Sequence, residues 1–110
     1  MTDKLLISGP PGSPKAKFPL GRLVITPGAQ EKCSDILQTK CLNRHQSGDW
    51  GIMDPDDVHQ NDRAVASGMR IMSAYAIDES KPCKGHGPNT LWIITEADRS
   101  VTTLLLPDEY

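Results

Sequence analysis

The sequence predicts an α+β fold: a small, mainly antiparallel four-stranded sheet with two helices packed on one face. Two helix-start signals, Thr26-Pro27 and Asp54-Pro55, each follow a stretch that is not helical in character. The C-terminal third holds three consecutive β-rich segments separated by loops, which favours antiparallel pairing. With 110 residues, of which 37% are hydrophobic, the chain is long enough for one core.

A flexible N-terminal tail is expected over residues 1–17, followed by a single α+β domain over residues 18–110. Residues 8–17 read SGPPGSPKAK, a run rich in Pro, Gly and Ser without apolar periodicity. Such a run buries too little surface to offset its chain entropy. No segment resembles a secretory signal, and none approaches the about 18 apolar residues of a membrane span. We therefore expect a cytoplasmic protein with no membrane partner.

The first half of the domain predicts a strand that leads directly into a helix. The strand covers Leu20–Ile25, and Thr26 caps the helix with Pro27 in its first turn. This helix is expected to continue to residues 43–45 as one unit, with a core-facing stripe at helical spacing. The stripe consists of Ala29, Cys33, Ile36, Leu37 and Cys41.

The second half predicts another helix and then three strands. Asp54 caps the helix, Pro55 takes its first position, and Gly68 ends it. The strands are expected over residues 69–78, 90–96 and 100–106, and the connection at 97–99 is short enough to require a hairpin. Residues 79–89 predict an exposed loop. We expect both tryptophans to be largely buried, and the sheet to contribute Ile71, Tyr75, Ile93 and Leu104 to the core.

Three segments resemble a family of short bacterial proteins carried on plasmids, phages and integrated elements. These segments are ITPGA at 25–29, SGDWG at 47–51 and TEADRSVTT at 95–103, and the resemblance covers residues 18–110. It implies a protein of a mobile genetic element, but the family has no established biochemical function. The loop at 81–87 departs from the family pattern, so a role for Cys83 or His86 would belong to this member alone.

Charge and motifs favour a protein that binds another protein. Twelve basic against fourteen acidic residues give a formal net charge of -2, so no overall field attracts nucleic acid. Together with the resemblance, this favours a non-enzymatic accessory protein that inhibits a host defence system, of the anti-restriction or anti-CRISPR type. One alternative is a nucleic-acid-binding regulator. Its basic residues would be Arg22, Arg44, Arg70 and Arg99.

A polar cluster is the candidate binding site, and it also supports a second alternative, a small hydrolase or nuclease. Its members are Arg44, His45, Asp49, Trp50, Asp98 and Arg99. An acid, a base and an arginine suffice for acid–base work if they converge. The plainer interpretation gives each residue a structural role, in which Asp98 stabilises a turn, Arg99 pairs with Asp49 or Asp98, and Trp50 covers the core.

The sequence predicts no cofactor, and zinc is the one alternative that its residues suggest. Cys41 and His45 stand at i and i+4 on a helix, and Cys83 and His86 form a C-x-x-H pair in a loop. Together they provide a Cys2His2 set suited to tetrahedral zinc. The alternative is a core thiol beside unrelated surface residues.

Two further features bear on partners. Methionines at 69 and 72 suit either a partner groove or ordinary core filling. The last strand carries apolar side chains on both faces, so either the first strand or another subunit covers it, and a homodimer is one expectation.

Overall fold

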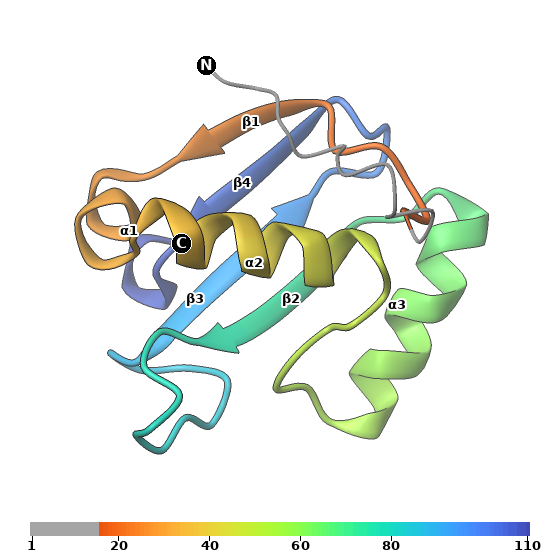
Figure 1. Cartoon of the computed structure of the whole chain (residues 1–110). Coiled ribbons are helices and arrows are strands. Elements are labelled where there is room, and N and C mark those ends of the chain that lie inside the picture. Colours follow the sequence, from red (N-terminus) through yellow and green to blue (C-terminus); the bar gives the residue numbers. More distant parts are fainter. Residues whose placement is uncertain (1–15) are drawn as a thin grey trace.

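The computed structural model describes residues 16–110, so the predicted tail lies outside the described residues except for its last two positions. Figure 1 shows α1 and α2 in front of a sheet, with α3 beside strand β2. The elements in chain order are β1 (Arg22–Ile25), α1 (Pro27–Lys32), α2 (Asp35–Gln46), α3 (Pro55–Ser67), β2 (Ile71–Ala76), β3 (Thr90–Thr95), β4 (Val101–Leu105) and the 3-10 helix η1 (Pro107–Glu109).

The sheet has four strands, as predicted, in the order β1-β4-β3-β2. β2 pairs with β3 and β3 with β4 in antiparallel fashion, and residues 96–100 make the expected hairpin. β1 pairs with β4 in parallel, with Arg22 opposite Val101 and Ile25 opposite Leu104. The sheet is therefore mixed: the connection through three helices returns the chain to β2 in the direction of β1, and the two antiparallel pairings that follow give β4 the same direction.

The prediction of one long first helix was wrong, and residues 16–110 form three α-helices instead of two. Cys33 is extended (φ -118°, ψ 121°), and the Ser34 side chain accepts a hydrogen bond from the Leu37 N–H, which starts a new helix. The break resets the helical register. Ile36, predicted to face the core, is consequently 82% exposed, while Ala29, Cys33 and Cys41 are buried as expected.

α3 begins and ends where its signals place it. The Asp54 carboxylate accepts from the Asp57 N–H, Pro55 is the first helical residue, and Gly68 adopts a left-handed conformation (φ 76°) after the last turn. The Asn61 side chain bonds both backbone groups of Met72 in β2, at 2.7 and 3.3 Å. α3 therefore lies along the outer edge of β2.

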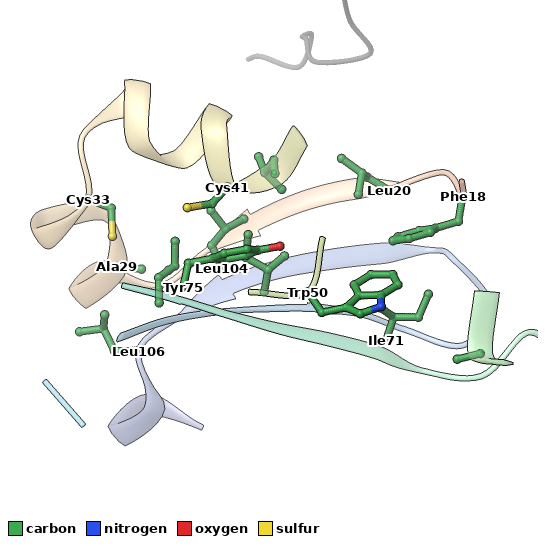
Figure 2. Packing of buried hydrophobic residues seen from close by; sticks show 14 residues of the cluster. Phe18, Leu20, Ala29, Cys33, Cys41, Trp50, Ile71, Tyr75, Leu104 and Leu106 are labelled. Carbon is green, nitrogen blue, oxygen red and sulfur yellow. The ribbon is translucent and has the colours of Figure 1, made fainter. Parts of the chain in front are cut away.

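The core lies between α1, α2 and one face of the sheet. Figure 2 shows Cys41 pointing from α2 toward Tyr75 and Leu104, with Phe18 and Trp50 side by side at the other end. Ile71, Tyr75, Ile93 and Leu104 are all buried, which confirms the predicted sheet contribution. Trp50 is buried as expected, whereas Trp92 is only half-buried because it lies on the other face of the sheet.

Candidate functional site

Arg44 and Asp49 form a bidentate ion pair at the surface. Arg44 lies in the last turn of α2, and its guanidinium donates to both oxygens of Asp49 at 2.7 and 3.2 Å. It also lies 4.7 Å above the Tyr75 ring, whose hydroxyl donates to the Asp49 carbonyl at 2.7 Å. The hydrogen bond from Arg44 lowers the pKa of the Asp49 carboxyl below its ordinary value. A bidentate pair stacked on an aromatic ring holds this loop in one position.

A shallow pocket of about 340 Å³ opens beside this pair, between the edge of β2 and the loop that follows it. Glu79 lies 3.9 Å from the Arg44 guanidinium, and Lys81 lies 3.9 Å from Asp78. The charges around the pocket thus largely compensate one another. It is lined by Arg44, Gly51, Ile52, Tyr75, Ala76, Glu79, Lys81 and Cys83.

His45 lies inside the protein rather than at this surface. Its Nδ1 is 2.6 Å from the Ser73 hydroxyl in β2, and its Nε2 is 2.9 Å from the Thr95 hydroxyl in β3. The ring is completely buried, and this burial lowers the pKa of His45 to about 3. The imidazole is therefore neutral at physiological pH and has no free nitrogen for a substrate proton.

The tautomer of His45 follows from its neighbours. Thr102 donates its hydroxyl proton to the Leu20 carbonyl at 2.7 Å, because a carbonyl oxygen can only accept. Thr95, 2.7 Å from Thr102, must then donate to Thr102 and accept from His45. The proton consequently resides on Nε2, and Nδ1 accepts from the Ser73 hydroxyl. This chain of hydrogen bonds joins α2 to β2, β3, β4 and the segment before β1.

Arg99 and Asp98 do not pair as predicted. The Arg99 guanidinium donates to the carbonyls of Ala64, Met69 and Glu96 at 2.7 to 3.2 Å, and lies 5.5 Å from the Phe18 ring centroid. Asp98 accepts from the Ser100 N–H within the turn, which confirms its predicted structural role. The pairing of Arg99 with Asp49 or Asp98 was therefore wrong, because Arg99 serves to tie the β3–β4 turn to the end of α3.

Trp50 covers the core and does not form a binding platform. The indole is 3% exposed, and its N–H donates to the Asp62 carboxylate at 3.0 Å. Its ring stacks near Phe18 (6.2 Å between centroids) and meets His45 edge-on (6.0 Å). The predicted cluster thus divides into a surface pair, Arg44 with Asp49, and residues that serve the fold.

The predicted zinc ligands are not brought together. Both nitrogens of His45 are engaged, and Cys41 is buried beside it with its pKa raised to about 11 by burial. Cys83 contacts the Thr90 hydroxyl at 3.2 Å, and His86 is exposed. No group of three or more His, Cys, Asp or Glu residues within residues 16–110 is arranged to hold a metal ion.

A surface cluster that the sequence did not reveal lies on the face of the sheet turned away from α2, hereafter the second face. Ser73 and Thr95 point to His45, so strand alternation places Met72, Ile94 and Trp92 on this second face. The Tyr110 ring meets Trp92 at 5.8 Å.

Arg70 completes this cluster. Its guanidinium lies 5.4 Å from the Tyr110 ring centroid and donates to the hydroxyl at 2.8 Å. Tyr110 is 71% exposed, and Met69, which precedes Arg70 in the chain, is 61% exposed. The sequence signalled only the methionines, because nothing local indicates that Tyr110 returns to β2 and β3.

The structure adds one observation on membranes: within the described part of the chain, no helix has the length and apolar character needed to cross a bilayer. Comparison of the chain with protein-family models, with curated proteins and with solved structures finds no match.

Proposed function

We propose that this chain is a non-enzymatic accessory protein of a plasmid or phage that acts by binding another protein, and that its target belongs to a host defence system of the restriction or CRISPR type. The observation that supports binding is a cluster on and beside the second face, in which Met69, Arg70 and Tyr110 are exposed and Trp92 is half-buried. The mobile-element and host-defence parts rest on the sequence resemblance.

The composition of this cluster is that of a protein interface. Tyr, Trp, Arg and Met are the residue types enriched at such interfaces, and Tyr, Trp and Arg dominate binding hot spots. The Arg70 guanidinium and the Trp92 ring, which meets Tyr110 in a T-shaped arrangement, hold the Tyr110 ring in place while most of Tyr110 remains accessible. A preorganised aromatic side chain loses little conformational entropy when a partner covers it.

The hydrolase or nuclease alternative is weaker because its general base is poorly suited to proton transfer. His45 has a pKa of about 3, and both ring nitrogens are engaged in the core. A general base works best when its pKa lies near the operating pH. Asp49 is likewise engaged by Arg44.

Two of the four arginines named for the nucleic-acid alternative already have partners within the protein. Arg44 is neutralised by Asp49, and the Arg99 guanidinium binds backbone carbonyls. Arg22 and Arg70 remain on the surface, which is few for a phosphate backbone.

Cross-linking in living cells followed by affinity purification tests the proposal. The tagged chain is expressed in a bacterial host with active restriction and CRISPR systems, beside a Met69→Ser/Tyr110→Ala double variant. We expect one host protein to be captured by the wild-type chain and lost with the double variant. Ile36→Ser on α2, which removes another exposed apolar side chain, is the matched control and should retain the partner. Capture unaffected by the double variant would rule out this cluster.

The host-defence part has its own test. We expect expression of the chain to raise the plating efficiency of a phage that the host restricts, and the double variant to lose this effect. Unchanged plating alongside a captured partner would reject the host-defence target while leaving protein binding in place. The same lysate with labelled single-stranded and duplex DNA tests the nucleic-acid alternative, which predicts salt-dependent retention.

A further inference from the structure

One edge of the sheet presents backbone groups that are not used within the described chain. The N–H groups of Arg22 and Thr26 point toward β4, where they donate to the carbonyls of Ser100 and Leu104 at 3.0 Å. Because strand residues alternate, the backbone groups of Leu23 and Ile25 point the other way, to the outside of the sheet. No backbone group of residues 16–110 pairs with them.

The opposite edge, formed by β2, is closed by the chain itself. Asn61 bonds the outward N–H and C=O of Met72 through its side-chain amide. Trp50 and Ile52 bond both outward groups of Ala74, at 3.1 and 2.7 Å. Two separate segments thus cover β2, whereas β1 has no such cover in the described residues. Unprotected edges are templates for pairing with another chain.

The side chains of β1 restrict what could pair there. Leu23 and Ile25 face α2 and pack against the core, so Arg22 and Val24 lie on the second face. Arg22 is exposed and Val24 is 37% exposed. An added strand therefore meets one guanidinium and one apolar side chain on that face. Opposite charges and apolar pairs across neighbouring strands are the combinations that stabilise a sheet.

We propose that the outer edge of β1 binds an extended segment of the partner protein by strand addition, with an Asp or Glu of that segment beside Arg22 and an apolar residue beside Val24. The main-chain bonds to Leu23 and Ile25 provide affinity, and the alternating side chains provide selectivity. This inference rests on the proposed protein-binding function and adds to it a second surface, at the opposite edge of the sheet from Arg70, together with a partner chemistry.

A displayed random peptide library, panned against the full chain, provides the probe. Enriched peptides are synthesised, and their dissociation constants are measured by fluorescence anisotropy. We expect them to carry an acidic residue two positions from an apolar one, because Arg22 and Val24 lie two positions apart on one face of β1. Leu23→Pro removes an outward N–H that β4 does not use, so β1 keeps its hydrogen bonds to β4, and circular dichroism verifies that the variant folds without the packing of the Leu23 side chain. It should weaken peptide binding about tenfold, which corresponds to about one lost hydrogen bond.

Charge reversal gives a second test that does not depend on how the proline variant folds. Arg22→Glu should change the selected peptides from acidic to basic. Arg63→Glu makes the same charge change on the exposed surface of α3 and should leave the selection unaltered.

Several results would overturn the inference: no enriched peptide, equal binding by a folded Leu23→Pro variant, or an unchanged selection with Arg22→Glu. Self-association of the chain that Leu23→Pro abolishes would identify a second copy as the occupant instead, and salt-dependent binding of single-stranded DNA through Arg22 would identify a nucleic acid. If the host partner is still captured in any of these cases, protein binding stands and uses another surface. If no host partner is captured, the proposed function itself fails.

Discussion

At the scale of single residues, His45 makes the stability of the chain depend on pH. Its pKa is about 3 in the folded chain and about 6.5 when unfolded, because burial disfavours the charged ring. As the pH falls, the unfolded state takes up the proton first. The contribution of His45 to stability is therefore complete above about pH 6.5 and declines steadily toward about pH 3. From pH 7 to pH 5.5 we expect a loss of about 1 kcal/mol in the free energy of unfolding.

Urea unfolding at the two pH values measures this loss. His45→Gln should abolish the difference between them, since no group then titrates at this buried position. His86→Gln changes an exposed loop histidine and should leave the difference intact. A His45→Gln variant that still loses stability over this range would show that another group is responsible.

At the scale of elements, the closure of the β2 edge depends on Gly51. A Cβ at this position would lie 2.0 Å from the Ala74 carbonyl oxygen, and the backbone φ is +77°. Gly87 has a similar φ of +92° but no atom within 4 Å of an added Cβ. Gly87→Ala should therefore cost about 1 kcal/mol for its backbone conformation alone. Gly51→Ala should cost about 2 kcal/mol more, because it also overpacks.

Thermal unfolding of both variants measures the difference. Equal shifts in Tm would mean that the loop moves away from β2 without penalty, and that the edge is not closed at this point in solution.

The break between α1 and α2 provides a second prediction at this scale. Ser34→Ala removes the side-chain oxygen that accepts from the Leu37 N–H, which should lower the free energy of unfolding by about 1 kcal/mol. Thr39→Ala, on an exposed position within α2, serves as the control and should cause no loss. Chemical denaturation distinguishes the two, and an unchanged midpoint for Ser34→Ala would mean that water replaces the cap.

Elements set by local chemistry could be predicted from the sequence, and those set by distant contacts could not. Thr26, Asp54 and Gly68 start or end helices through bonds to residues within a few positions. The break at Ser34 was missed because the apolar spacing of Ala29 and Cys33 continues through Ile36 as if one helix were present. The parallel pairing of β1 is a property of the whole path of the chain.

The candidate site shows the same limit. Arg44 and Asp49 were both named in the predicted cluster, but their pairing across five residues was not, because Arg99 was the residue expected to pair with Asp49 or Asp98. The Arg99 guanidinium donates to the carbonyls of Ala64 and Met69, about thirty positions away in the chain. No local sequence pattern indicates these distant acceptors. The burial of His45 likewise depends on Ser73 and Thr95, each on a different strand.

At the scale of the whole molecule, one cluster of buried residues extends from Phe18 before β1 to Leu106 after β4. The hydrogen-bond chain through His45 crosses the same layer. We therefore expect residues 16–110 to unfold in a single cooperative transition.

Fluorescence and far-UV circular dichroism test this cooperativity. In a Trp92→Phe variant, fluorescence reports Trp50 alone, and its denaturation midpoint should coincide with that of the circular dichroism signal. A Trp50 transition at lower denaturant would show that Trp50 and its loop detach before the sheet.

Within the described residues, the chain covers the β2 edge of the sheet but not the β1 edge, and this difference limits the size of any assembly that forms through the sheet. A strand that joins β1 finds no matching site at β2, where Asn61 and residues 50–52 already occupy the outward groups. Continuous stacking of strands into a fibre needs two available edges on every molecule. Association through this sheet therefore ends after a single addition, and the complex that results is finite and discrete.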